Sequence, residues 1–465
     1  MKVYQKILLK ILYFIVTVLV LSVLAFYNKL PLLYPDSGTY LFNSSSLNPP
    51  VDKAMGYSLF IHLVTWQATT WTIVLFQNLI ISWLIFMFLR LFFAGKRLYK
   101  FHVISIVILT MFTSLCWFSC LVMPDIFTPA MVLVIIIFII SEKLSLIHTI
   151  IYLSLLFIFL VSHLSHLLLL CFVLIPLLIF LFLRKKTQTT QRMMKQRCYM
   201  LIVTAVVSTL FLMTYNYRHG LGFKTSPTSN VLLTAKFCNT GILKRYLDDN
   251  CNSLSNCVLC QYKDSLPTSS DAFLWGNHSP LYHYNPPMNI DTPWLEANEA
   301  YAPIINGILS TPAYYPQLIS DAIMCTWQQL IAIKVGTGKI PFGINSAPYY
   351  PYRDKFPGEL DEFMQSRQNT GKLHFETVEI INRIAVLLSL LLIMLAVFYI
   401  KPDFTLWLST AIIFLSLLGN ALITSSLSVV EDRYQSRIIW LLPLLALVFL
   451  YKTLIKNKHL SVHES

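Results

Sequence analysis

The sequence predicts an all-α polytopic membrane protein with about ten transmembrane helices and one large hydrophilic region. Of its 465 residues, 56% are hydrophobic and only 12% are charged, and the mean hydropathy is +0.63. Soluble domains carry about 25% charged residues, so the composition excludes an ordinary soluble protein. Apolar runs of about 20 residues recur along the chain, which is the length that a helix needs to cross the hydrocarbon core of a bilayer.

Ten apolar segments are predicted to span the membrane. They lie at about 7–27, 70–93, 101–121, 126–141, 148–162, 167–183, 198–216, 380–400, 404–427 and 438–451. The first is too long for a signal peptide and has no small-residue cleavage site, so we interpret it as a retained anchor. The run from Thr149 to Leu183 would be far longer than the ~30 Å core as one helix. Its polar break "SHLSH" (Ser162–His166) predicts two short helices.

Basic residues separate by side when both termini are placed in the cytoplasm. Eighteen Lys and Arg residues then lie in inner loops and tails, whereas the short outer loops hold four, namely Lys29, Lys53, Arg433 and Arg437. This bias predicts a multi-pass protein of the bacterial inner (cytoplasmic) membrane with its outer loops in the periplasm. The net charge of +13 is therefore a topology signal, and we expect no nucleic-acid partner.

The chain is predicted to have three parts. Residues 1–216 form an N-terminal transmembrane domain with a first outer loop at 28–69, and residues 379–465 form C-terminal transmembrane helices. Between them, 217–378 holds 13 of the 22 prolines, which indicates an ordered, partly helical, loop-rich periplasmic domain. Within it, the residues from Leu318 to Ile331 have an amphipathic pattern. This pattern predicts either a helix along the membrane surface or a helix packed on the domain's own core.

Five cysteines lie outside the predicted spans. They are Cys238, Cys251, Cys257, Cys260 and Cys325. The stretch "CNSLSNCVLC" is dense enough for a disulfide-bonded loop in an oxidising compartment, and disulfides with one cysteine left over are the favoured interpretation. A zinc knuckle is the alternative, but "CVLC" lacks the second pair of ligands that such a site needs.

Titratable side chains gather at the outer ends of the predicted spans. Asp36 lies in "LLYPDSGTYLF", Asp125 in "VMPDIF", and His163 and His166 in "SHLSH", while "VVEDRYQSR" carries an acidic pair and two arginines. Ionisable groups near hydrocarbon are costly unless paired or hydrated, so their gathering indicates a functional site. Each has a simpler role as an alternative: the aspartates could cap helices, the arginines could pair with Glu431 and Asp432 or contact headgroups, and the histidines could be hydrogen-bonded at the interface.

This set of residues suits sugar transfer from a lipid phosphate. A carboxylate can accept the proton of an attacking hydroxyl, and arginines bind phosphate oxygens through charge-assisted hydrogen bonds. We predict Asp36 as general base and Asp125 as a second catalytic acid that positions the acceptor or supports Asp36. The predicted substrate-binding residues are Lys53, Tyr57, His163, His166, Arg433, Tyr434 and Arg437. A divalent metal could bind two carboxylates beside a phosphate, but the sequence requires no cofactor.

Short motifs in the membrane domain resemble the GT-C superfamily of polytopic glycosyltransferases, in particular the bacterial protein O-mannosyltransferase and aminoarabinose-transferase group. They are "PDSGTYL" and "DKAMGYSLF" in the first outer loop, "MPDIF", and "EDRYQSRIIWLLP" near the C-terminus. The resemblance implies an inverting transfer from a polyprenyl-phosphate-linked sugar to a glycan, lipid or protein acceptor, with Asp36 at the catalytic position. It also implies juxtamembrane helices, which would suit 55–66. The chain departs from the family in "GYS" for "GYP", in Lys53 for arginine, and in 217–378, which matches no family domain.

Two other function classes remain open. A polysaccharide polymerase or ligase also has a large outer loop and outer arginines, and it would depend on arginines of that loop more than on Asp36. A lipid or solute transporter or flippase would place ionisable groups near the membrane midplane on broken helices. The interiors of the predicted spans are almost free of charge, which disfavours the transporter.

Overall fold

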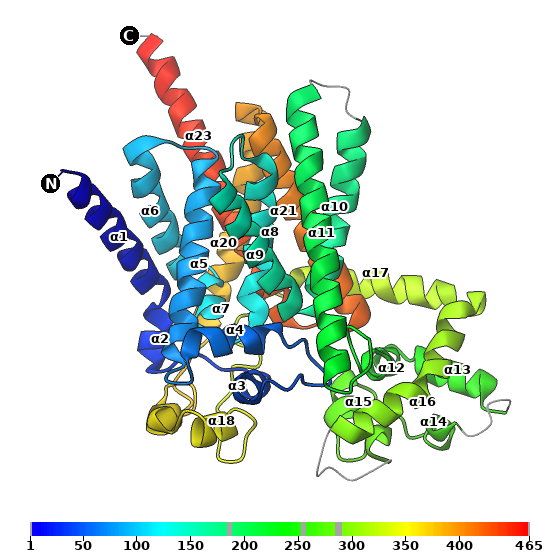
Figure 1. Ribbon diagram of the computed structural model, residues 1–465. Helices are drawn as coiled ribbons and strands as arrows, with labels where there is room; N and C mark the ends of the chain where they lie inside the picture. Colours follow the sequence, from blue (N-terminus) through cyan, green and yellow to red (C-terminus); the bar gives the residue numbers. More distant parts are fainter. Residues whose placement is uncertain (1, 184–187, 253–256, 284–290, 464–465) are drawn as a thin grey trace.

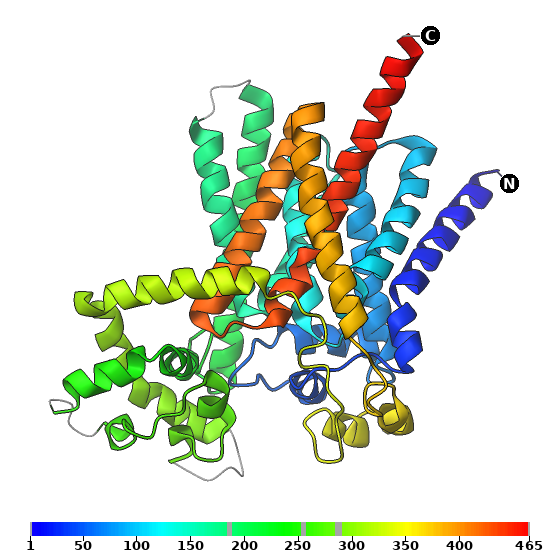
Figure 2. The ribbon, with the colours of Figure 1, turned by 180° about the vertical axis from the view of Figure 1, so that it is seen from behind.

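The computed structural model describes residues 2–183, 188–252, 257–283 and 291–463, and these residues form an all-helical protein (Figure 1). About three quarters of the chain is helix, and within the described ranges the only β-pairing is one isolated bridge between Leu32 and Leu121. Two views from opposite sides show a bundle of long helices with smaller helices gathered at one end (Figures 1 and 2). Both chain termini lie at the other end. The end with the smaller helices is called the domain side below.

Among the described residues, six helices are long and apolar enough to cross a membrane, which supports the prediction of a membrane protein with transmembrane helices. They are α5 (Trp71–Arg90), α10 (Leu164–Leu183), α11 (Gln188–Arg218), α20 (Glu376–Ile400), α21 (Phe404–Leu427) and the Asp432–Leu454 segment formed by α22 (Asp432–Ile439) and α23 (Leu441–His463). Shorter apolar helices accompany them, including the end of α1 (Lys2–Leu21), α8 (Phe127–Ile140) and α9 (Leu146–Ser162). The predicted break at "SHLSH" is confirmed, because α9 ends at Ser162 and α10 begins at Leu164.

Other predicted spans are interrupted where polar side chains bond to neighbouring elements. The segment 101–121 divides into α6 (Gly95–Phe112) and α7 (Leu115–Ser119). At the break, the Ser114 backbone N–H donates to Asn382 Oδ1 at 3.0 Å, and its hydroxyl donates to the Ser436 carbonyl at 2.6 Å. These long-range bonds replace the local helical bonds. The segment 7–27 likewise divides into α1 and α2 (Val23–Asn28) at Ser22.

The bundle core surrounds α8. Each side chain from Phe127 to Ile139 on this helix is buried, which is typical of a helix that is apolar on every face and lies in the centre of a bundle. The neighbouring 3₁₀-helix η1 (Pro124–Ile126) carries Asp125. The first residues of the central helix therefore lie at the domain side, where the other predicted site residues gather.

The hydrophilic region packs in two different ways. Residues from Val231 to Tyr314 form a second hydrophobic core, which includes the buried side chains of Phe273, Trp294 and Tyr301. Its helices are α12 (Ser229–Asn239), α13 (Ile242–Asn250), α14 (Val258–Gln261), α15 (Ser270–Trp275), η2 (Pro280–His283), α16 (Asp291–Ser310) and η3 (Pro312–Tyr314). Residues 333–373 instead contribute Val335, Phe342 and others to the core of the bundle. Their helices are α18 (Tyr349–Asp354), η4 (Pro357–Glu359) and α19 (Leu360–Gln365), and α17 (Tyr315–Ile331) joins the two parts.

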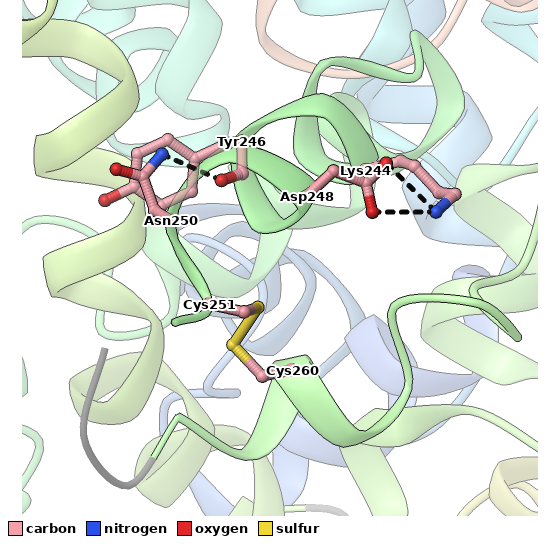
Figure 3. Close-up of a disulfide and its surroundings, with 6 residues drawn as sticks. All are labelled: Lys244, Tyr246, Asp248, Asn250, Cys251 and Cys260. Carbon is pink, nitrogen blue, oxygen red and sulfur yellow. Dashed lines mark hydrogen bonds and ion pairs between the residues drawn. A yellow bond between two sulfur atoms is a disulfide. The ribbon is translucent and has the colours of Figure 1, made fainter. Parts of the chain in front are cut away.

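A disulfide between Cys251 and Cys260 closes a short loop of the second core (Figure 3). Cys238, Cys257 and Cys325 are free. The favoured interpretation of disulfides is therefore right for one pair, but three of the five outer cysteines stay unpaired instead of one. Next to the disulfide, Lys244 donates to the Asp248 carboxylate at 3.0 Å on the exposed face of α13.

Gly56, at the start of α4 (Gly56–Thr65), allows this helix to pack against the end of α9. A Cβ atom at this position would lie 2.3 Å from the backbone carbonyl of Val161. Because backbone cannot yield as a flexible side chain does, we expect Gly56→Ala to destabilise the protein by about 1–3 kcal/mol. Thermal unfolding in detergent measures the loss. Gly343→Ala is the matched control, since nothing lies within 4 Å of a Cβ there, and an unchanged midpoint for Gly56→Ala would contradict this packing.

Candidate ion-pair site

Two segments far apart in sequence are joined in parallel at the domain side. Leu32 donates its N–H to the Cys120 carbonyl and accepts from the Val122 N–H, with both N–O distances at 2.9 Å. The Ser37 hydroxyl also donates to the Val122 carbonyl at 2.8 Å. Parallel pairing places residues at equal offsets side by side. Asp36 and Asp125 each follow the paired residues Leu32 and Leu121 by four positions, and both carboxylates lie beside Arg433.

Five charged side chains of alternating sign form a continuous row, which we call the ion-pair ladder. Its members are Lys53, Asp36, Arg433, Asp125 and Arg437. Lys53 Nζ lies 3.4 Å from Asp36 Oδ1, and Arg433 Nη1 lies 3.3 Å from Asp36 Oδ2. On the other side, Asp125 Oδ1 lies 3.8 Å from Arg433 Nε and 3.4 Å from Arg437 Nη1. The structure therefore brings together residues from the first loop, η1 and α22.

The ladder runs from a partly exposed end to a fully buried one. The Asp36 side chain is 29% exposed, whereas Asp125 is 1% exposed and Arg437 is completely buried. At the exposed end, Lys53 also pairs with Asp52. At the buried end, Arg437 Nη2 donates to Asn420 Oδ1 at 3.0 Å. Only the Asp36 end of the ladder is therefore open to a second molecule without rearrangement.

Aromatic rings enclose the guanidinium of Arg433. The Tyr34 ring centre lies 4.2 Å from Arg433 Cζ and the Tyr434 ring centre lies 5.0 Å from it, while Tyr434 also lies 5.2 Å from Arg437. A cation over an aromatic face is stabilised without using its N–H donors. The rings therefore hold the two arginines in place and leave donors available.

The arginines have donor capacity that the protein does not use. The Nε atoms of Arg433 and Arg437 are buried and have no hydrogen-bond partner within the described residues. The ladder contacts of 3.3–3.8 Å are also longer than the 2.7–2.9 Å of a tight charge-assisted bond. Buried, unsatisfied donors are costly. An anionic ligand would satisfy them.

Lys339 adds a further buried cation that sequence reasoning missed. It is 3% exposed, its Nζ donates to the Val335 carbonyl at 2.6 Å, and it lies 4.6 Å from the centre of the Phe118 ring. Burial lowers the pKa of Lys339 to about 8, against the attraction of Asp125 and with added repulsion from Arg433. The deepest layer of the site thus holds three buried cations, Lys339, Arg433 and Arg437, and one buried carboxylate, Asp125.

The charges of the ladder keep Asp36 ionised. Burial alone would raise the pKa of Asp36, but the positive charges of Lys53 and Arg433 outweigh burial and hold it below its ordinary value. Burial lowers the pKa of Lys53, but Asp36 and Asp52 outweigh it and raise that pKa above its ordinary value. At neutral pH the open end of the ladder is therefore a carboxylate that can accept a proton.

The simpler roles predicted for the aspartates and arginines are not the ones that the structure uses. Asp36 is the residue before α3 (Ser37–Ser46), but its side chain makes no capping hydrogen bond, and the side chain of Asp125 caps neither η1 nor α8. The two arginines pair with Asp36 and Asp125 and not with Glu431 or Asp432. Asp432 instead accepts from the Lys334 N–H and the Thr337 hydroxyl, each at 3.0 Å.

Three predicted binding residues lie outside both the ladder and the aromatic rings that pack on its arginines. The Tyr57 hydroxyl donates to Gln77 Oε1 at 2.6 Å, and its ring packs in the core against Tyr40 and Phe127. Both ring nitrogens of His166 are occupied, by Thr128 Oγ1 at 2.8 Å and the Phe159 carbonyl at 2.7 Å. His163 contacts Ser165 and the His166 ring. No hydrogen bond or ion pair of the described chain joins these three residues to the ladder.

Two other positioning residues are missing from the sequence prediction. Gln368 holds the Asp36 segment, because its amide accepts from the Leu33 N–H at 3.0 Å and donates to the Leu33 carbonyl at 2.8 Å. Asn420 holds Arg437 and also donates to the Tyr434 carbonyl at 2.7 Å. A polar residue inside an apolar span is a functional signal, so Asn420 could have been found. Gln368 lies in an irregular segment that gives no such signal.

No protein-family model, curated protein sequence or solved structure matches this chain. The class of protein is therefore assigned from the fold and the site alone. The protein is a helical membrane protein that carries a partly buried row of charges at one end of its bundle. Among the described side chains, no group of three or more His, Cys, Asp and Glu residues is placed to hold a metal ion.

Proposed function

We propose that this protein is an inverting membrane glycosyltransferase that moves a sugar from a polyprenyl-phosphate donor to an acceptor at the domain side. The observation that carries the proposal is the excess of buried cationic donors beside a partly exposed, ionised carboxylate. The donor phosphate supplies a further anion at the Asp36 end, beside Arg433, and the buried charges of Arg437 and Lys339 attract it from the layer behind. Short motifs that resemble the GT-C glycosyltransferases add support to the same assignment, and the site requires no metal for it.

In the proposed reaction, an acceptor hydroxyl attacks the anomeric carbon while Asp36 takes its proton. The bond between the anomeric carbon and the phosphate oxygen breaks, and the electron pair leaves with the polyprenyl phosphate. The arginines and Lys339 stabilise the charge that develops on the leaving phosphate. Asp125 keeps the two arginines in position, since it is too buried to reach an acceptor.

Arg433 has a second effect in this mechanism, because it contacts Asp36 before the donor binds. A phosphate that competes for the Arg433 guanidinium weakens that contact, so the pKa of Asp36 rises toward its ordinary value. A carboxylate with a higher pKa is a stronger base. Donor binding therefore prepares Asp36 for proton transfer.

The test is direct transfer by the purified protein. Incubation with radiolabelled polyprenyl-phosphate sugars and membrane glycolipid, glycan or protein acceptors should give a labelled product with inverted anomeric configuration, read by NMR. A protein that binds none of these donors and transfers none of these sugars would overturn the proposal. Transfer that persists without Asp36 but requires arginines of 217–378 would favour a polymerase or ligase.

The pKa of Lys339 predicts an alkaline limit to activity. The charged form of Lys339 attracts the donor phosphate, so the specificity constant for the donor should fall as the pH rises through about 8. Lys339→Arg should remove this limit because arginine stays protonated. Lys339→Met should lower the constant below pH 8 and make it independent of pH across this range. Initial rates at low donor concentration, on either side of pH 8, measure the effect. A wild-type profile that is flat across this range would exclude this role.

Lys339 also makes the stability of the folded protein depend on pH, and stability should rise with pH where activity falls. Its pKa in the folded protein is lower than the ordinary lysine value of 10.5, so the unfolded chain binds more protons between the two values. The free energy of unfolding therefore rises with pH in that window. Thermal unfolding of the wild type should show this rise, and Lys339→Met should lack it.

A further inference from the structure

The helix α17 has an apolar face that the protein leaves uncovered. Its exposed large apolar side chains are Tyr315, Ile319, Ile323, Met324, Trp327 and Ile331, with exposed fractions of 41–67%. Most of them recur every four residues, so they form one stripe along the helix. The other exposed residues of α17 are Pro316, Ser320 and Gln328, and none is charged. A stripe of this kind is rare on a surface that faces water.

The orientation of α17 differs from that of the spanning helices. It lies crosswise to α20 and α21 at the domain side of the bundle, as both views show (Figures 1 and 2). Its other face packs on α21 and α22, with Thr326 and Gln329 buried. The residues of the predicted amphipathic face are thus divided between two environments. Thr326 is packed against the bundle, whereas Ile319, Ile323 and Trp327 are exposed.

We propose that α17 is an interfacial helix whose exposed stripe lies in the lipid leaflet at the domain side. The stripe is continuous with the membrane-facing surface, because α17 packs against the end of α21, a spanning helix whose Leu427 is also exposed. An amphipathic helix at this depth buries its apolar face against the acyl chains. Trp327 and Tyr315 are residue types that favour the membrane boundary.

This placement sets the depth of the ion-pair ladder. Gln329 of α17 donates to the Glu431 carbonyl at 2.8 Å and accepts from the Glu431 N–H at 2.9 Å. Glu431 lies two residues before Arg433. The arginines are therefore fixed at the height of α17, which is the headgroup layer where a lipid phosphate lies. This last consequence rests on the proposed function, whereas the position of α17 does not.

Quenching of tryptophan fluorescence by brominated lipid tests the position. In vesicles made of phosphatidylcholine brominated near the head of its acyl chains, Trp327 should be quenched. Trp327→Phe should therefore lower the quenched fraction of the emission. Trp275→Phe is the matched control, since Trp275 is 49% exposed on α15, a helix of the second core, and its loss should raise the quenched fraction.

A second variant shows whether Trp327→Phe changes the quenching only because it disturbs the fold. Ile323→Trp in the Trp327→Phe background should restore the quenching, because Ile323 shares the exposed stripe. If the emission lost in Trp327→Phe is unquenched and Ile323→Trp adds only unquenched emission, the stripe is covered by protein or faces water, and the proposal is overturned. Sugar transfer plays no part in this measurement, so its outcome is independent of the proposed function.

Discussion

Asp36→Asn should abolish sugar transfer while the protein keeps its fold. The asparagine retains the size of the side chain and can still accept hydrogen bonds from Lys53 and Arg433, but it cannot take a proton at neutral pH. Loss of a positioned general base costs about 10²–10⁴-fold in rate. The turnover number should therefore fall by this factor, while the dissociation constant for the donor should improve or stay unchanged, because Arg433 is released from a competing charge. Single-turnover transfer and equilibrium donor binding measure the two quantities.

Asp52→Asn is the matched control for this prediction. Asp52 is a neighbouring carboxylate that pairs with Lys53 but not with an arginine, so its loss should change the rate by less than about tenfold. Equal losses in the two variants would indicate an effect on the loop and not on a base. Full turnover in Asp36→Asn would exclude the general-base role.

Asp125→Leu should cause the largest loss of stability of any single change in the ladder. It leaves two guanidinium groups, of which Arg437 is completely buried, without the carboxylate between them. Removal of one partner of a buried ion pair costs about 3–5 kcal/mol, because the remaining charge stays in a poorly solvating environment. The thermal unfolding midpoint in detergent should fall sharply, and inorganic phosphate or a polyprenyl phosphate should raise it again by binding the freed cations.

The double variant Asp125→Leu with Arg437→Met separates charge from packing. Replacing both partners by apolar side chains of similar volume is often neutral for stability, so most of the loss should be recovered. A double-mutant cycle gives the coupling energy of the two residues. If the two losses simply add, the pair does not interact and the ladder is not a connected unit.

Sequence patterns were sufficient for the helical class, the membrane location and the gathering of Asp36, Asp125, Arg433 and Arg437 at one end. Each of these residues lies at a predicted span boundary, and sidedness alone brings such boundaries together. The pairing within the ladder could not be predicted, because it depends on one parallel bridge between segments without a strand pattern. Lys339 was missed because it lies in an irregular segment where no period marks which side chains are buried.

The interruptions of predicted spans have a similar cause. Thr113 and Ser114 look acceptable inside an apolar helix, and only the long-range partners Asn382 and Ser436 favour the break between α6 and α7. His163, His166 and Tyr57 lie at the correct end of the bundle, but their partners are protein groups. The position of a residue at the end of a predicted span therefore predicted how deep it lies in the bundle. It did not predict which side chains it contacts.

The parallel pairing of Leu32 with Leu121 limits how the length of this chain can vary. Both carboxylates follow the bridge at the same spacing, so one residue added or removed between Leu32 and Asp36, or between Leu121 and Asp125, would shift one carboxylate away from the arginine that both contact. Insertions within these two spacers of equal length should therefore be rejected.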